Sequence, residues 1–267
     1  MLNRLSAATK RYGIAGTVRA AMRKALSLGN EPPELLRGVF STYEEAIAAV
    51  SPGLLAGYNN QEIVDECVEH FSTILPSDAP VLQWLERLLP SVTTILDAGG
   101  HVGVKYRAFR EHLRLDDRQV NWIVYDTPAM VRAGRQRAAR EGLERLSFIE
   151  KPKDAPLIDL MLCSGLLQFL DIPFPELMRQ LPARPRHLLL NKVATRDGRT
   201  VVTLVRIAGA EVPYQIRDRA EFLRSLDSLG YEIVDEWVLP EFTRPITADP
   251  SLGASTSRGY YARLSRP

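Results

Sequence analysis

Residues 93–103, Thr-Thr-Ile-Leu-Asp-Ala-Gly-Gly-His-Val-Gly, decide the fold of this chain. An apolar run ends in Asp97, and three glycines follow within six positions. This pattern predicts a buried strand that stops at Asp97 and turns sharply into a helix that begins near Val104. Glycine has no Cβ, so the backbone of such a turn can approach a ligand closely and can adopt a positive φ. The stretch therefore predicts a ligand-binding turn between a strand and a helix.

The position of the acid distinguishes between possible ligands. In the dinucleotide fingerprint of nicotinamide-dependent dehydrogenases, the glycines follow the strand directly and an acid comes about 20 residues later. Here Asp97 precedes Gly99, Gly100 and Gly103. That order resembles the first motif of the class I S-adenosylmethionine-dependent methyltransferases, Asp-x-Gly-x-Gly-x-Gly, with His101 in the place of the middle glycine. The resemblance implies that these five residues bind S-adenosyl-L-methionine.

The bulk composition is that of an ordinary soluble globular protein. The chain has 267 residues, of which 45% are hydrophobic and 25% are charged, and a formal net charge of +2. This near-balance gives no reason to expect nucleic-acid binding. Cys67 and Cys163 are the only cysteines, so we expect no disulfide framework and a cytoplasmic protein. No apolar run approaches the ~18 residues that span a bilayer.

Residues 1–30 differ from the rest because six basic side chains occur before the first acid, Glu31. Apolar residues between Val18 and Leu26 fall at helical spacing, which indicates a basic amphipathic helix. Such a helix can lie on an anionic membrane surface. It can equally be a solvated helix, or one packed against a partner. The sequence leaves both interpretations open, and with them the oligomeric state.

The pattern along the chain predicts an α/β fold, doubly wound, with a mostly parallel sheet, an antiparallel edge and a helical N-terminal cap. Residues 41–75 have a helical pattern, with Ser41 or Thr42 as N-cap. After about residue 90, short apolar runs alternate with helical stretches, as in a parallel sheet covered on both faces. We therefore expect a cap region over residues 1–90 and a Rossmann-like domain over 91–267. The expected strands are 94–97, 122–125, 146–149, 158–163, 187–191, 201–206, 231–238 and 260–264.

Further candidate site residues follow the later strands. Ligands of open α/β sheets lie beyond the carboxyl ends of the strands, where Asp126, Glu150, Ser164 and Gly165 occur. A carboxylate at Asp126 can accept hydrogen bonds from both hydroxyls of a ribose, although Asp126 can also cap the helix that starts at Pro128. Glu150 can accept from an adenine amino group or be an ordinary surface acid.

Beyond the general motifs, the chain resembles a narrower bacterial family of methyltransferases that is often linked to the synthesis of surface polysaccharides. The resemblance extends from about residue 38 to residue 264, and that family has a side chain in the place of His101. It implies the cofactor and the reaction type, but not the acceptor. The matching segments are Asp97–Tyr106, Gly57-Tyr58, Trp122, Pro128–Val131, Ser164–Leu170 and Pro213–Ile216.

Candidates for catalysis are fewer. Methyl transfer to a hydroxyl benefits from a base with a pKa near the working pH, and His101 is one candidate, although it can also simply pack beside the cofactor. Gln168 follows the fourth strand, where it can face an acceptor or be an ordinary residue of a helical turn. Tyr214 follows Pro213 in an expected loop and can line the acceptor side. Tyr58, in the cap region, can close over the cofactor or anchor the cap. No spacing of histidines, cysteines and carboxylates suggests a metal site.

The sequence thus predicts an enzyme that transfers a methyl group from S-adenosyl-L-methionine to a small-molecule or glycan acceptor, at oxygen. A second hypothesis is a catalytically inactive Rossmann-like module that still binds the cofactor. A third, a nicotinamide-dependent dehydrogenase, is disfavoured by the order of the acid and the glycines.

Overall fold

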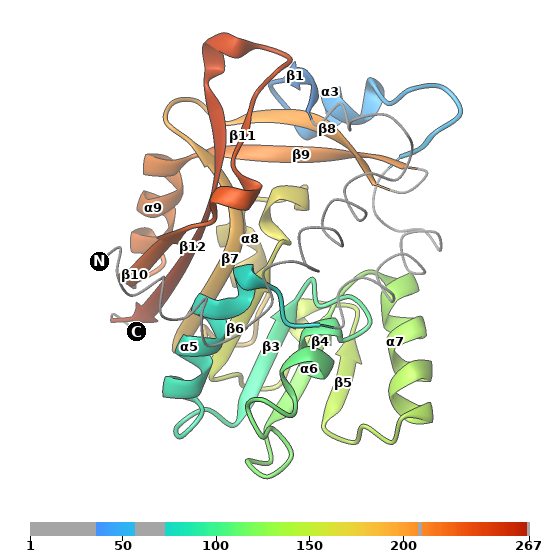
Figure 1. The fold of residues 1–267 in the computed structure, drawn as a ribbon, viewed down its shortest axis with the longest axis vertical. Coiled ribbons are helices and arrows are strands. Elements are labelled where there is room, and N and C mark those ends of the chain that lie inside the picture. The colour runs from blue at the N-terminus through green and yellow to red at the C-terminus, as the bar shows by residue number, and fades with distance from the viewer. Residues whose placement is uncertain (1–35, 57–72, 208–209, 266–267) are drawn as a thin grey trace.

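The structure is a computed structural model that describes residues 36–56, 73–207 and 210–265. Within these ranges it has a large mixed sheet with helices on both faces (Figure 1). The strands are β1 (Arg37–Phe40), β2 (Leu55–Ala56), β3 (Thr94–Ala98), β4 (Asn121–Tyr125), β5 (Leu146–Ile149), β6 (Leu160–Ser164), β7 (His187–Arg196), β8 (Val201–Ile207), β9 (Ala210–Asp218), β10 (Tyr231–Val238), β11 (Arg244–Pro245) and β12 (Ala254–Leu264). The helices are α3 (Tyr43–Ala48), α5 (Ala79–Leu88), α6 (Val104–Phe109), α7 (Pro128–Arg140), α8 (Phe174–Arg179) and α9 (Arg219–Ser228). Short 3₁₀ turns are η1 (Pro76–Asp78), η2 (Pro152–Asp154), η3 (Leu167–Phe169), η4 (Pro240–Phe242) and η5 (Pro250–Leu252).

The central strands lie in the order β5-β4-β3-β6-β7-β12-β10. From β5 to β7 every neighbouring pair is parallel, whereas β12 is antiparallel to both β7 and β10. The chain order reverses between β3 and β6, which is the point of an open α/β sheet where ligands bind. The expected doubly wound sheet with an antiparallel edge is confirmed.

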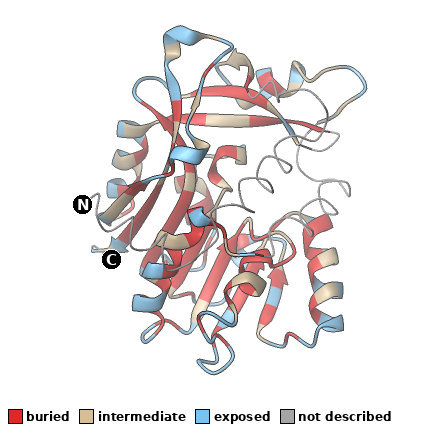
Figure 2. Cartoon of the chain, in the orientation of Figure 1, coloured by how far each residue is buried: buried red, intermediate tan, exposed pale blue. Residues whose placement is uncertain are grey.

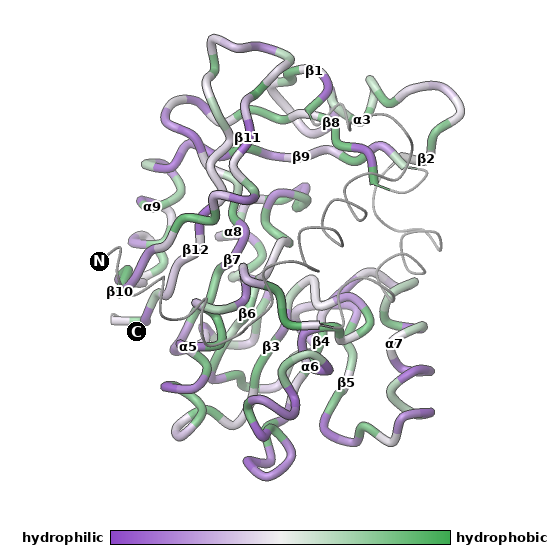
Figure 3. The backbone as a smooth tube through the Cα atoms, in the orientation of Figure 1, coloured by the Kyte–Doolittle hydropathy of each residue, from purple (hydrophilic) through white to green (hydrophobic). Residues whose placement is uncertain are grey.

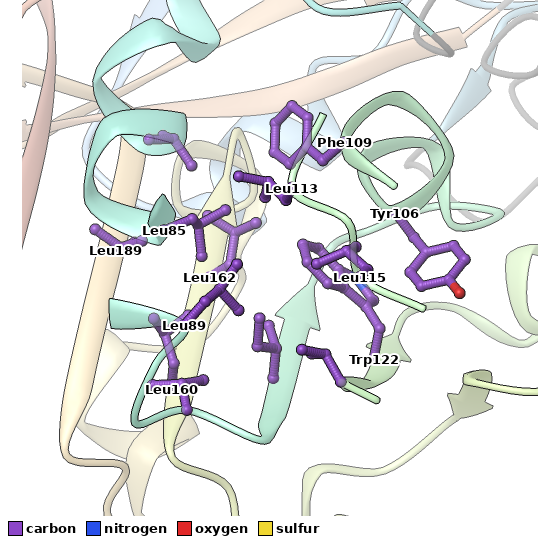
Figure 4. Packing of buried hydrophobic residues seen from close by; sticks show 14 of the residues in the cluster. Leu85, Leu89, Tyr106, Phe109, Leu113, Leu115, Trp122, Leu160, Leu162 and Leu189 are labelled. Atoms are coloured by element: carbon purple, nitrogen blue, oxygen red, sulfur yellow. The ribbon is translucent and has the colours of Figure 1, made fainter. Parts of the chain in front are cut away.

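The two faces of this sheet have separate hydrophobic cores because side chains alternate along each strand. In β4, Trp122 and Val124 belong to the core under α5, α6 and α7, while Ile123 belongs to the core under α8 and α9. The indole of Trp122 is fully buried and meets Tyr106 and Phe109 edge-on at 6.0 and 6.5 Å (Figure 4). Figure 2 shows the same strands as buried along most of their length, so they form a rigid platform for the loops at their carboxyl ends.

The covering helices have one apolar and one polar side. Along α7, apolar and polar residues alternate as the helix turns (Figure 3). Gly134 on its inner side lets the helix lie close to β5, since a Cβ there would be 2.3 Å from the ring of Phe148. The helix begins at Pro128, which suits a first turn where the missing N–H has no partner to lose.

A second set of strands lies beyond the carboxyl end of the central sheet (Figure 1). β8 and β9 form an antiparallel hairpin, and β9 joins the end of β7 through Thr195 and Arg196. Val212 of β9 is buried with Val102, in the loop that follows β3, and with Met130, in the first turn of α7, which follows β4. The hairpin therefore packs against the loops where a ligand of the central sheet would lie.

The N-terminal region departs in part from the expectation. Thr42 is the N-cap of α3, as expected, and its side chain accepts from Glu45 N. β1 lies within the expected helical cap but is a strand that pairs with β8. Four residues with a partner distant in sequence carry too little local pattern to be recognised. The helix expected over residues 1–30 lies outside the described residues, and the division near residue 90 stays a prediction.

Candidate functional site

The turn after β3 has a backbone that only a few residue types adopt easily. Gly99 has φ +74° and donates its N–H to the carbonyl of Tyr125 at 2.8 Å. A Cβ on Gly99 would lie 2.8 Å from Cβ of Leu166, so any side chain there would force the neighbouring loop away. Gly103, the N-cap of α6, has φ +83°. Both glycines are needed by this strand-to-helix turn.

His101 takes the place of the missing glycine without changing the turn. Its φ is +53°, in the left-handed region where histidine occurs more often than most side chains. Its backbone N–H donates to Oδ2 of Asp126 at 2.8 Å. The loop after β3 is thereby tied to the carboxylate that follows β4.

Asp97 lies beneath the turn. The residue is 1% exposed, and its Oδ2 accepts from the indole N–H of Trp122 at 3.1 Å. A Cβ on Gly100 would be 2.5 Å from the same oxygen, so glycine is required above it. Burial raises the pKa of Asp97 to about 7, against the opposing effect of the Trp122 hydrogen bond. Asp97 supports the turn from below, and its predicted contact with a cofactor stays a prediction.

A cavity of about 390 Å³ opens at the carboxyl ends of β3, β4 and β6. It is within the size range of small-molecule sites, and it lies at the point where the strand order reverses. Asp126 borders it and is 8% exposed; its Oδ1 accepts from the N–H of Thr127 at 2.7 Å. The cavity is lined by Tyr43, Gly99, His101, Tyr125, Asp126, Thr127, Pro128, Glu150, Gly165, Leu166, Phe169, Leu170 and Asp171.

The structure brings five sequence candidates together in this cavity: Gly99, His101, Asp126, Glu150 and Gly165. They come from segments up to 66 positions apart, the span from Gly99 to Gly165, and meet because their strands are parallel neighbours.

The other candidates that the structure describes are not part of the cavity lining. Gly100 and Gly103 shape the turn, as described above. Ser164 is the last residue of β6, and its Oγ lies 3.5 Å from Nδ2 of Asn191. Gln168 is buried in η3, 6% exposed. Tyr58 lies outside the described residues.

Tyr214 corrects the sequence analysis, which placed it in a loop. It lies within β9, opposite Thr203 of β8, and its ring meets Phe169 edge-on at 5.5 Å. Pro213 suggested the loop because proline lacks the N–H of a strand ladder. It is tolerated here because β9 has a second neighbour only near its two ends, at Ala210–Glu211 and Arg217–Asp218. Tyr214 therefore contacts Phe169 of the cavity lining but is not itself a lining residue.

Several lining residues were missed. Tyr125 and Thr127 flank Asp126. Four others lie within six positions after Gly165, so closeness in sequence to a candidate was the signal available; they are Leu166, Phe169, Leu170 and Asp171. Tyr43, at the start of α3, had none. In the described residues, no group of three or more histidines, cysteines and carboxylates could hold a metal ion.

Comparison with known proteins places the fold. No family model and no curated protein matches the sequence. An O-methyltransferase family protein from Burkholderia thailandensis matches with a TM-score of 0.50 and 14% identity, over 76% of this chain and 60% of that one. The chain has the class I methyltransferase fold.

Other solved structures of this kind are more distant in shape. The 1,6-didemethyltoxoflavin-N1-methyltransferase of Burkholderia thailandensis, solved with S-adenosylhomocysteine, has a TM-score of 0.47 and 18% identity, over 71% of this chain and 79% of that one. The N-terminal domain of EvdMO1 with SAH bound has a TM-score of 0.47 and 16% identity, over 73% of this chain and 82% of that one.

Proposed function

We propose that this protein is an S-adenosyl-L-methionine-dependent methyltransferase that acts on a small-molecule or glycan acceptor, at oxygen. The observation that carries the proposal is the Asp126 carboxylate, which borders a cavity beside the glycine turn at the switch point of the sheet. Each of its oxygens accepts one backbone N–H, from His101 or Thr127. A carboxylate oxygen has a further lone pair, so both oxygens can still accept from the two hydroxyls of a ribose.

The residues of the cavity fit the other parts of this cofactor. Leu166, Leu170 and Phe169 provide an apolar wall for an adenine ring, and Glu150 can accept from its amino group. Gly99 and Gly165 have positive φ and no side chain, so the backbone of both loops can approach the methionine part. The bound cofactor supplies an electrophilic methyl group. The task of the chain is to hold an acceptor oxygen about 3 Å from that carbon, in line for displacement.

One feature of the sheet favours this function over a dehydrogenase. The doubly wound sheet of dinucleotide-binding enzymes is mostly parallel, with strand order 3-2-1-4-5-6. Here the antiparallel β12 lies between β7 and β10, and the acid precedes the glycines. An inactive module would keep the same binding site, so only product formation distinguishes it from an enzyme.

We also propose that the protein is cytoplasmic. A cytoplasmic location is supported by the cysteine content, and Cys163 is free and buried. Among the helices that the structure describes, none has both the length and the apolar character to cross a bilayer. The link to surface polysaccharides and the contact of residues 1–30 with a membrane rest on the sequence alone.

Calorimetric titration with S-adenosylhomocysteine tests the proposal. Asp126→Asn should weaken binding by about 10- to 150-fold, the scale of a lost hydrogen bond to a charged group. Asp227→Asn is the matched control, since Asp227 is exposed on α9 and should leave binding unchanged. Circular dichroism verifies that both variants fold. Absence of binding to the folded parent chain would overturn the proposal.

A transfer assay separates the enzyme from the inactive module. Hydroxyl-bearing sugars and nucleotide sugars are supplied with S-adenosylmethionine, and release of S-adenosylhomocysteine is measured. Acceptor-dependent release supports the enzyme, whereas binding without release from any acceptor supports the module.

A further inference from the structure

Lys192 has an unusual backbone in the middle of β7. Its φ is +59°, which is uncommon for a residue with a side chain and is often found at functional sites. The pairing of β7 with β12 explains how this conformation arises. Leu190 pairs with Tyr260 and Val193 with Arg258, so Asn191 and Lys192 together face Gly259. This is a β-bulge, a device that redirects a side chain out of the regular pleat.

The redirected side chain lies against the wall of the cofactor cavity. A Cβ on Gly165, which lines the cavity, would be 3.8 Å from Cδ of Lys192 and 3.7 Å from Nε2 of Gln168. Gly165 thus faces a space bordered by both side chains. In the described part of the chain, Oε1 of Gln168 is buried without a hydrogen-bond partner, although buried amide oxygens are normally paired. An acceptor hydroxyl is a suitable partner for it.

The amine of Lys192 also lacks a partner of opposite charge. Within residues 36–56, 73–207 and 210–265 it has no hydrogen bond or ion pair, and its Nζ lies 5.1 Å from the centre of the Phe242 ring. The charged groups that face it are Lys105 of α6, Asp78 of η1 and Glu241 of η4.

Asp78 cannot serve as that partner, because it is already engaged. Both of its oxygens accept from Nζ of Lys105, at 2.8 and 2.7 Å, and one also accepts from Leu75 N. Burial, with a smaller effect of the Lys105 ammonium, lowers the pKa of Lys192 to about 8. A neutral amine is therefore available near neutral pH, as a general base requires.

We propose that Lys192 is the catalytic base of this site, and that Gln168 accepts a hydrogen bond from the acceptor and orients it. The inference rests on the proposed function. The acceptor is then a neutral hydroxyl that must lose its proton during transfer.

The balance of the step is simple. The acceptor oxygen forms a bond to the methyl carbon while the bond from that carbon to sulfur breaks. The electron pair of the broken bond stays on sulfur, which loses its positive charge. The hydroxyl proton passes to the neutral amine of Lys192, and the resulting ammonium releases it to water.

The first test measures the ionisation of the amine without any acceptor. Competitive acetylation of the full chain over a range of pH, read by peptide mass spectrometry, gives an apparent pKa for each lysine. The exposed Lys151 and Lys153 are internal references. Lys192 should titrate at least one unit below them. An apparent pKa equal to that of the references would overturn the proposal.

The second test places the amine beside the transferred group. A positive Lys192 repels the sulfonium of S-adenosylmethionine but not the uncharged sulfur of S-adenosylhomocysteine. The ratio of the two dissociation constants is measured for the parent chain, Lys192→Met and Lys192→Arg, at about pH 6.5 and about pH 9.5. At the lower pH, Lys192→Met should favour S-adenosylmethionine about three- to tenfold more than the parent does.

At the higher pH the parent should match Lys192→Met, while Lys192→Arg should keep the penalty at both values because arginine stays charged. Asp97 and His101 are present in all three proteins, so their titration cancels in the comparison. A purely structural lysine would give the same ratio in all three, which overturns the proposal for Lys192 alone. If the folded parent does not bind S-adenosylhomocysteine, the proposed function itself fails.

Discussion

Replacing Asp97 by asparagine tests the account of the turn through stability. Burial raises the pKa of Asp97 from 3.8 to about 7, so the folded chain binds this proton more tightly than the unfolded chain does. Stability is therefore lost as the pH rises from about 4 to about 7. Three pKa units correspond to at most about 4 kcal/mol. Asparagine has no charge to bury, and its Oδ1 can still accept from the Trp122 indole. The stability of Asp97→Asn should therefore not fall over this pH range.

The assay is urea unfolding of the parent chain and of Asp97→Asn at about pH 4.5 and about pH 8. Relative to the parent, the variant should gain about 3 kcal/mol in the free energy of unfolding between the two pH values, because part of the effect is already lost at pH 4.5. Asp227→Asn, at an exposed position, shows what a surface carboxylate contributes. A stability difference between parent and Asp97→Asn that does not change with pH would refute the reasoning.

Three further predictions concern the same region. Gly99→Ala should destabilise the fold by about 2–4 kcal/mol. Gly142 also has a positive φ but has open space around it, so Gly142→Ala should cost only about 1 kcal/mol. Urea unfolding measures both costs, and equal values would contradict the contact at Gly99. Lys105→Met should lower the free energy of unfolding by about 3–5 kcal/mol, because the charge of Asp78 is left buried without its partner. The double variant with Asp78→Leu should recover most of this loss in the same assay. No recovery would show that the cost is not electrostatic. His101→Gly should keep the affinity for S-adenosylhomocysteine within about threefold, since glycine adopts the same φ readily; calorimetry measures this, and a larger loss would assign the side chain a direct contact.

The sequence predicted those parts of the fold whose pattern is local. The run that ends at Asp97 and the continuous burial of Trp122–Val124 in β4 follow from apolar residues alone. Both ends of β5 agree with the expected range 146–149. β1 was missed because its partner β8 lies far along the chain. β9 was missed although β8 is its neighbour in sequence, because Pro213 interrupts its strand pattern. Pro213 suggested a loop, but proline is tolerated within β9 because one edge of this strand is unpaired except near its two ends.

The site shows the same division. Asp126 and Gly165 were found because each directly follows a strand of a parallel sheet. Lys192 was not, because a bulge in β7 redirects it, and that bulge depends on the register with β12 and on Gly259. No local pattern in the sequence around residue 192 predicts such a register shift.

A crystal structure of the chain with S-adenosylhomocysteine tests the central claim most directly. We expect the two ribose hydroxyls within hydrogen-bonding distance, about 2.5–3.0 Å, of the Asp126 carboxylate, and the sulfur between Gly99 and Gly165 on the side that faces Lys192. The account is contradicted if the ligand lies elsewhere, or if His101 fills the cavity and the folded chain takes up no ligand.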